Sequence, residues 1–512
     1  MALYQRFGLN YRWLATFTSM LGSFATLLTA TIINVAIPDV MGAFGMNQDQ
    51  AQWLATGFLA SNTVTMLLSA WAIESFGMAR TFNVSMLIFT IGSILGGMAN
   101  SSEMIIFSRV IQGAGAGLIT PISMLIIFQV FPVHRRGSAM GIYSVGVVLA
   151  PALGPALGGW LIDHYSWRYV FYVAIPFALA TIPLVALFMP EREADAQDVR
   201  FDWTGVILLS LFLVSLLTTL SNIDKEGLYS DFIALASFIS LTSLAAFLCW
   251  ELHTQDPMFN LSLFRNPKFL AAGVVTVVMG AGLYGSTYLF PLFLQIVQRL
   301  TPTDAGKLMI PAGLFMAIAF PIAGRLSDAV RPRNLILLGL AVFALSSWLY
   351  AGVDANTPIF SLILWMTIGR IGLALIFPSL NVTALRPLPL QLLAQGSGII
   401  NFLRQVGGAF GVNALSIFLQ QRTGFHTAAL SETQTPDNST TMTLLAQAHS
   451  ALIHNGIAEP FAGIQGFHLL GSIVYAQGIT HAFRDSFLLV ALVFVFCLIP
   501  GSFMDNRAPV RQ

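Results

Sequence analysis

Long apolar runs alternate with short polar connections from near the start of the chain to near its end. A helix needs about twenty apolar residues to cross a bilayer. Runs of that length predict fourteen membrane-spanning helices, an even number that places both ends of the chain on one side. The predicted spans are 13–36, 52–73, 82–100, 104–130, 138–162, 169–189, 204–222, 231–251, 269–297, 304–327, 334–353, 357–384, 392–420 and 485–504.

Two stretches about half a chain apart are similar to each other. Ala70–Arg80 (AWAIESFGMAR) has a counterpart in Gly324–Arg333 (GRLSDAVRPR), and an arginine inside a span, Arg109, is answered at a similar offset by Arg370. Parallel repeats of several helices are a recurrent design of transporters. The predicted domains are an N-terminal six-helix half (1–190), two extra helices with linkers (191–268) and a C-terminal six-helix half (269–512).

Composition narrows the class of protein. Of the 512 residues, 56% are hydrophobic and 9% are charged, whereas soluble domains carry about 25% charged residues. A net charge of +1 leaves no basic surface for nucleic acid. Cys249 and Cys497 lie in apolar runs, and no span places His near Asp, Glu or Cys at ligand spacing. We therefore expect a polytopic membrane protein without metal or cofactor, and the sequence argues against an enzyme.

Basic residues predict the orientation. Arginine and lysine are concentrated in the loops on the side of the two chain ends, as at Arg80, Arg135 and Arg136. Loops rich in these residues face the cytoplasm. We expect both termini to be cytoplasmic.

The span 138–162 is unusually rich in glycine and proline. Small residues at four-residue spacing let a neighbouring helix approach closely, and proline interrupts the helical hydrogen bonds. We expect a tightly packed, kinked helix whose key residues are Gly146, Pro151, Gly154, Pro155, Gly158 and Gly159.

Three arginines, Arg109, Arg370 and Arg404, lie inside predicted spans, with Gln112 one turn from Arg109 and Gln405 next to Arg404. A charged side chain at this depth costs at least about 2.5 kcal/mol and usually faces a cavity or the bundle interior. Two interpretations stay open, a substrate pathway or a structural arginine that binds backbone carbonyls. No Asp, Glu or His is predicted at mid-membrane depth.

These motifs resemble those of the fourteen-helix drug:proton antiporters of the major facilitator superfamily, the EmrB/QacA type. The first-helix motif is matched by LTATIINVAIP, residues 28–38, which includes Thr29 and Asn34. The fourth-helix motif is matched by Arg109, Gln112 and Gly113. Further matches are the glycine-proline helix, the loop residues Glu74, Gly77 and Arg80 with Asp328 in the second half, and Gly396–Gly411.

The resemblance implies an all-α integral membrane protein with the major facilitator fold. It implies export of small amphipathic or hydrophobic compounds by proton antiport across a bacterial inner membrane. The implied substrate and proton pathway contains Thr29, Asn34, Arg109, Gln112, Arg370, Arg404 and Gln405, and the implied cytoplasmic gate contains Glu74, Gly77, Arg80 and Asp328.

One departure keeps alternatives open. Relatives usually carry a carboxylate where this chain has Thr29, so an uncoupled facilitator or a transporter of organic or fatty acids is also compatible with the sequence. The long connection 421–484 contains a polar segment and two amphipathic segments. We expect a periplasmic loop with helices lying on the membrane surface, or a docking site for a periplasmic adaptor protein and, through it, an outer-membrane channel.

Overall fold

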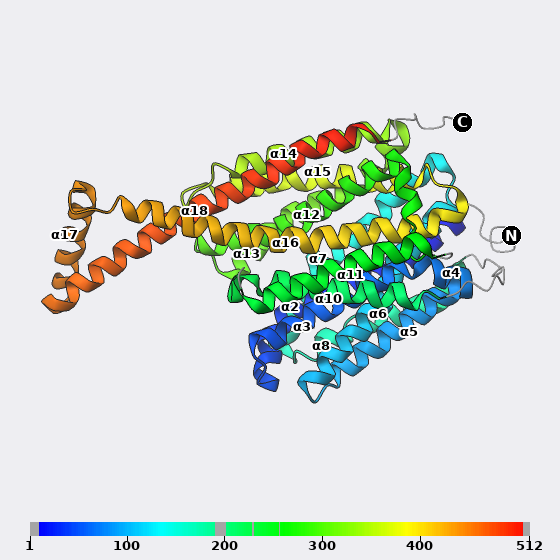
Figure 1. Ribbon diagram of the computed structural model, residues 1–512, viewed down its shortest axis with the longest axis horizontal. Helices are drawn as coiled ribbons and strands as arrows, with labels where there is room; N and C mark the ends of the chain where they lie inside the picture. Colours follow the sequence, from blue (N-terminus) through cyan, green and yellow to red (C-terminus); the bar gives the residue numbers. More distant parts are fainter. Residues whose placement is uncertain (1–9, 190–200, 228–229, 255–256, 505–512) are drawn as a thin grey trace.

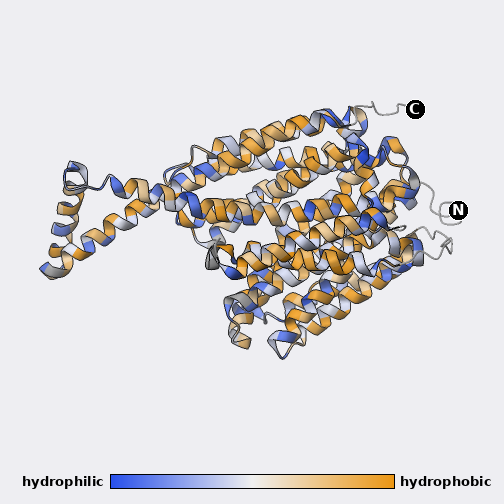
Figure 2. Cartoon of the chain, in the orientation of Figure 1, coloured by the Kyte–Doolittle hydropathy of each residue, from blue (hydrophilic) through white to orange (hydrophobic). Residues whose placement is uncertain are grey.

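The computed structural model describes residues 10–189, 201–227, 230–254 and 257–504. The apolar runs form a bundle of roughly parallel helices (Figure 1). Thirteen helices of the described part are long and apolar enough to cross a bilayer, and the bent pair α3 and α4 supplies a fourteenth crossing. The predicted number of spans is therefore confirmed. Hydrophobic residues cover the middle of the bundle, and hydrophilic ones gather toward its ends (Figure 2).

The N-terminal half holds α2 (Asn10–Phe44), α3 (Gln48–Leu67), α4 (Ser69–Phe76), α5 (Met78–Gly97), α6 (Ser102–Val130), α7 (Arg136–His164), α8 (Tyr169–Tyr172) and α9 (Ile175–Phe188). The extra pair is α10 (Trp203–Glu226) and α11 (Asp231–His253). The C-terminal half holds α12 (Pro267–Ile296), α13 (Pro302–Ala329), α14 (Pro332–Tyr350), α15 (Ile359–Leu385), α16 (Leu393–Glu432), α17 (Ser439–His454) and α18 (Glu459–Ser502). Short 3-10 turns η1 (Val133–Arg135), η2 (Leu261–Arg265) and η3 (Leu390–Leu392) lie between them.

The predicted span 52–73 is bent instead of straight. Its two helices, α3 and α4, meet at an angle of 55° around Leu68. The hydroxyl of Ser69 donates to the Met66 carbonyl at 2.8 Å. A side chain that bonds to the preceding turn competes with the helical ladder and favours a bend.

The start of α2 and the end of α18 lie at the same end of the bundle, which is here called the terminal end. Trp13 of α2 packs edge-on against Phe131, just after α6, with ring centroids 5.0 Å apart. The chain then enters α7, whose first turn contacts the end of α13. A Cβ on Gly501 of α18 would lie 3.1 Å from Leu337, near the start of α14.

The connection 421–484 differs from the prediction. The helices α16 and α18 do not end at 420 and begin at 485 but continue beyond the bundle, and α17 lies across their tips (Figure 1). These parts of α16, α17 and α18 form a projecting hairpin at the end opposite the terminal end. The ends expected at 420 and 485 are therefore absent from α16 and α18. The polar residues of this segment predicted that the helices end there. Several of them instead pair between α16 and α18, and both helices continue.

Candidate functional site

Arg109 lies in the centre of the N-terminal half, with no exposed surface. Its Nε donates to the Leu54 carbonyl of α3 at 2.8 Å, and its Nη1 donates to the Gln112 side chain at 2.8 Å and to the Thr29 carbonyl at 3.4 Å. The guanidinium also lies 4.3 Å from the ring centroid of Phe58. These contacts tie α2, α3 and α6 together. They match the structural interpretation of Arg109, in which it binds carbonyls.

The two first-helix candidates differ in exposure. Thr29 is buried, and its hydroxyl donates to the Ala25 carbonyl of its own helix at 3.1 Å. Asn34 is exposed. Only Asn34 has its side chain accessible in this conformation.

Arg370 of α15 is almost fully buried in the C-terminal half. Its Nη2 donates to the hydroxyl of Thr287 on α12 at 3.0 Å. Arg370 is the counterpart of Arg109 in the sequence repeat, but the two arginines have different partners. Arg370 bonds to a side chain, where Arg109 bonds to two backbone carbonyls.

Arg404 of α16 lies where the halves meet. Its guanidinium donates to the Asn401 side chain and lies 4.7 Å from the ring centroid of Phe377 on α15. It also interacts electrostatically with Tyr284 of α12 and with Tyr143 of α7 in the opposite half. These five residues are here called the Arg404 junction. None of the four partners is a carboxylate.

Gln405 extends the same polar surface, since its side chain accepts a long hydrogen bond of 3.5 Å from the Tyr284 hydroxyl. Tyr143 is held from its own side by the hydroxyl of Ser23 on α2 at 2.8 Å. A polar and aromatic surface thus runs through the middle of the bundle.

The glycine-proline helix α7 packs against α2. A Cβ on Gly146 would lie 2.2 Å from Met20, one on Gly154 would lie 2.4 Å from Thr31, and one on Gly158 would lie 2.8 Å from Ile32. Gly159 has nothing within 4 Å of such a Cβ. Pro151 and Pro155 are exposed and lie within one continuous helix. Three of the four predicted glycines therefore meet a neighbour.

Asp328 at the end of α13 joins the two halves at the terminal end. Its carboxylate accepts from the backbone N–H groups of Gly137 and Ser138 at 2.7 Å each, and from the Ser138 hydroxyl at 2.5 Å. Both N–H groups belong to the first turn of α7, where N–H groups lack helical partners and attract an anion. The carboxylate therefore holds the start of α7 against the end of α13.

Sequence reasoning missed the backbone contact beside Asp328. A Cβ on Gly137 would lie 2.6 Å from the Gly324 carbonyl, and one on Gly141 would lie 2.5 Å from the Phe320 carbonyl. The available signal was the pair of glycines four residues apart at the start of α7, a spacing that predicts close helix packing.

A second contact between the halves joins α16 to α6. The Ser397 hydroxyl donates to the Pro121 carbonyl at 3.0 Å, and the Asn401 amide lies 3.7 Å from the Met124 sulfur. The N-terminal gate residues lie nearby in the fold. Glu74 is on α4, which packs on α16, while Gly77 has a φ of 79° between α4 and α5, and Arg80 is exposed.

Residues 19–412 match the Major Facilitator Superfamily. The chain belongs to this superfamily of membrane transporters. The uncharacterized MFS-type transporter YhcA of Bacillus subtilis is 32% identical over 82% of this chain and 79% of its own length. The multidrug export protein EmrB of Haemophilus influenzae is 29% identical over 95% of this chain and 94% of its own. The structure of the proton:xylose symporter XylE, 13% identical, covers 94% of this chain and 95% of its own with a TM-score of 0.61.

In this superfamily member, a polar cluster holds the base of the hairpin. Arg422 and His426 of α16 contact the same Asp485 oxygen of α18, at 2.6 and 2.7 Å. The His426 ring lies 5.4 Å from that of His481. The prediction placed Asp485 at the start of the last span and the other three residues in the connection 421–484, whereas the structure places all four inside long helices.

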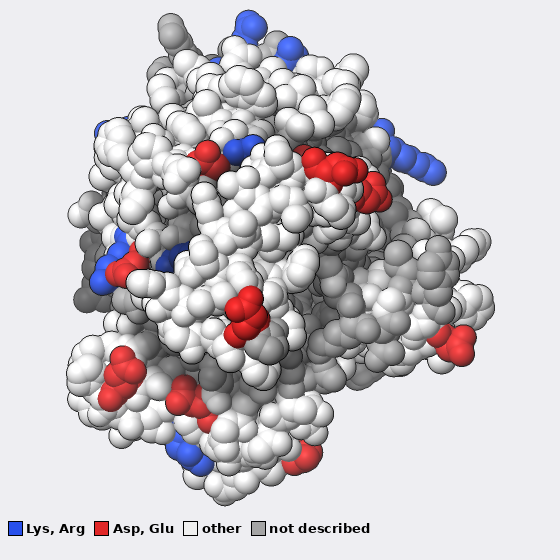
Figure 3. All heavy atoms as spheres, turned by 90° about the vertical axis from the view of Figure 1, so that its left-hand side faces the viewer, with Lys and Arg blue, Asp and Glu red and all other residues white. Residues whose placement is uncertain are grey.

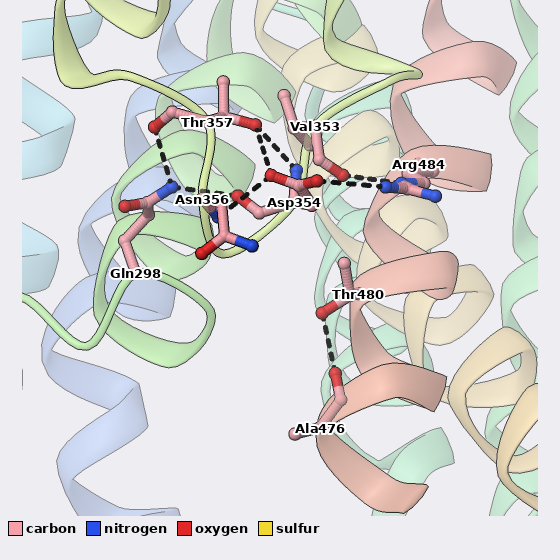
Figure 4. Close-up of polar contacts among 8 residues, drawn as sticks. All are labelled: Gln298, Val353, Asp354, Asn356, Thr357, Ala476, Thr480 and Arg484. Carbon is pink, nitrogen blue, oxygen red and sulfur yellow. Dashed lines mark hydrogen bonds and ion pairs between the residues drawn. The ribbon is translucent and has the colours of Figure 1, made fainter. Parts of the chain in front are cut away.

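The same base is tied to the loop between α14 and α15 (Figure 4). Arg484 donates to the Val353 carbonyl at 2.5 Å, and Gln298 donates to the carbonyls of Asp354 and Thr357 at 2.9 and 3.2 Å. The loop is therefore bound to α18 and to the residues that directly follow α12. On the face of the transporter that carries the hairpin, acidic and basic side chains are scattered without a large patch of one sign (Figure 3).

Proposed function

We propose that this transporter is a secondary active exporter of small amphipathic or hydrophobic compounds, driven by proton antiport. It lies in a bacterial inner membrane with its terminal end in the cytoplasm, and its halves rock around the Arg404 junction. The structure described here then has its cytoplasmic end closed by Asp328 and by the contacts of α16 with α6. The relatedness to multidrug export proteins supports the export direction.

The Arg404 junction is the observation that carries this proposal. It combines a guanidinium with aromatic and amide groups from both halves. Aromatic rings bury an apolar body, and a guanidinium binds an anionic or polar head group. At an effective dielectric near 20, two charges about 4 Å apart interact by roughly 4 kcal/mol. The junction therefore favours neutral or weakly acidic amphiphiles over lipophilic cations.

Two alternatives remain within the same fold, an uncoupled or differently coupled facilitator and a transporter restricted to organic or fatty acids. Uptake into everted vesicles separates them. Accumulation of a lipophilic acid that requires an imposed pH gradient supports antiport, whereas accumulation to equilibrium without a gradient supports a facilitator. Export of neutral amphiphiles beside acids contradicts the restricted transporter.

The charge preference is tested with matched variants. Arg404→Gln should reduce transport of the acid, Arg422→Gln at the hairpin base should not, and Thr29→Asp should shift preference toward a lipophilic cation. Strong export of the cation by the unmodified chain, unchanged by Thr29→Asp, would contradict the preference.

We further propose that the projecting hairpin binds a periplasmic adaptor protein, which connects the transporter to an outer-membrane channel. Large apolar side chains on α18 are exposed there, among them Phe461, Ile464 and Phe467. Exposed apolar clusters on a soluble projection are typical of protein contact sites.

A further inference from the structure

Two carboxylates meet at the terminal ends of the extra helices α10 and α11. One oxygen of Asp202, Oδ1, accepts from the Gly205 N–H and from the Trp250 indole N–H, both at 2.8 Å. One oxygen of Glu251, Oε2, accepts from the Phe259 N–H at 3.1 Å. Each carboxylate therefore has one oxygen held by donors and one oxygen left over.

The two remaining oxygens face the same gap. Both Asp202 Oδ2 and Glu251 Oε1 are buried without a hydrogen-bond partner. A Cβ on Gly205 would lie 2.2 Å from Asp202 Oδ2 and 3.0 Å from Glu251 Oε1, so only glycine leaves this space. Glu251 is just 3% exposed. Two buried acceptors of like charge that lie close together without a donor are strongly unfavourable.

A proton on the buried Glu251 carboxyl group removes this repulsion. With that proton bound, Glu251 is neutral and the pair carries a single negative charge. A metal ion fits less well, because Ca²⁺ and Mg²⁺ need six or more oxygen ligands and the other two oxygens already hold N–H donors. The described residues contain no group of three or more His, Cys, Asp or Glu that could hold a metal ion.

We propose that Asp202 and Glu251 form a proton-binding site that holds α10 and α11 against the two six-helix halves at the cytoplasmic side. The indole ring of Trp71 on α4 packs on Phe201, next to Asp202, with centroids 4.4 Å apart. Phe259, which donates to Glu251, packs on Phe402 of α16 with centroids 5.8 Å apart. The pair therefore connects to α4 in one half and to α16 in the other.

Release of the proton to water leaves two negative charges in the gap, which repel each other and loosen the ends of α10 and α11. Among the described residues, the charge that acts electrostatically on Glu251 is that of Asp202. Titratable groups near the terminal end of the neighbouring elements include Cys249 and His253 of α11, Glu74 of α4, Arg265 of η2 and Lys268 of α12. The His253 ring contacts the Cys249 carbonyl of its own helix at 2.7 Å.

The test uses the purified full-length chain in detergent, without substrate. The unfolding midpoint is measured from about pH 5 to pH 9 for the wild type, Asp202→Asn and Glu251→Gln. A wild-type pair that binds a proton is stable at low pH and loses stability as pH rises. In either variant an uncharged amide replaces one of the two carboxyl groups at every pH, so this loss should disappear. The control Asp231→Asn, at the far end of α11, should keep the wild-type profile.

An infrared measurement needs no variant. The wild type should show the band of a protonated, hydrogen-bonded carboxyl group that disappears as pH rises. Its absence at all pH values, or identical pH profiles of the wild type and both variants, would overturn the proposal. A wild-type midpoint raised at fixed pH by Na⁺, Mg²⁺ or Ca²⁺ but not in Glu251→Gln would also overturn it, in favour of a cation site. Because transport is not measured, these outcomes are independent of the proposed function.

Discussion

Asp328→Asn should weaken the closure of the terminal end. The wild-type carboxylate accepts three hydrogen bonds from the first turn of α7, two of them from backbone N–H groups. An asparagine side chain offers a single oxygen, and its amide group then faces one of the N–H donors. The substitution also removes the negative charge that the start of α7 attracts.

The size of the effect follows from the lost contacts. A hydrogen bond to an ionised group contributes about 1.5–3 kcal/mol, and a charge at a helix end contributes about 0.3–1 kcal/mol. Loss of one such bond and of the charge amounts to about 2–4 kcal/mol. At about 1.4 kcal/mol per tenfold change, the closed state should lose roughly 30- to 700-fold in its equilibrium with the open state.

Spin labels can report this equilibrium. Val84 on α5 and Leu338 on α14 belong to different halves and are about half exposed, so cysteines there can be labelled after Cys249 and Cys497 are replaced by serine. Asp328→Asn should add longer distances between the labels and reduce efflux. Asp304→Asn is the control, because this acid on the same helix pairs with Lys307 and not with α7. Unchanged distances in Asp328→Asn would show that the carboxylate does not hold the end closed.

Three further predictions follow from other contacts. Gly154→Leu and Gly158→Leu should abolish efflux while the protein still inserts, because the leucine side chains would collide with α2. The control Gly159→Leu should remain active, since that position is open. Normal efflux by the first two variants would refute the packing role. Arg109→Lys should reduce the free energy of unfolding by about 2–3 kcal/mol and so lower the unfolding midpoint, because lysine cannot bond to the Leu54 carbonyl and Gln112 together. A midpoint equal to that of the wild type would contradict this. Replacing Phe461, Ile464 and Phe467 by serine, or deleting 432–463, should spare transport in vesicles but remove resistance in cells. The control Gln447→Ser should keep both transport and resistance. If both activities survive or both fail in the first two variants, the adaptor proposal is wrong.

Local patterns in the sequence were enough to predict the membrane class, the number of spans and the all-helical fold. The hydropathy and length of each apolar run predict a span without knowledge of its neighbours. This is because every backbone group inside a bilayer must be paired within its own helix. The arginines were visible because charged residues are rare at that depth, and the α7 glycines were visible because of their spacing along one helix.

The partners of these residues depended on the tertiary structure. Asp328 and Ser138 are 190 positions apart, and Arg109 and Leu54 are 55 apart, so no local pattern indicates that they touch. The tertiary structure placed Arg109 among carbonyls and Arg404 at the junction of the halves, although both are arginines within spans. It also extended α16 and α18 through polar residues, because Arg422 and His426 of α16 both bond to Asp485 of α18. Spacing along one helix determines which face a residue occupies, but only the packing of several helices determines which group lies opposite.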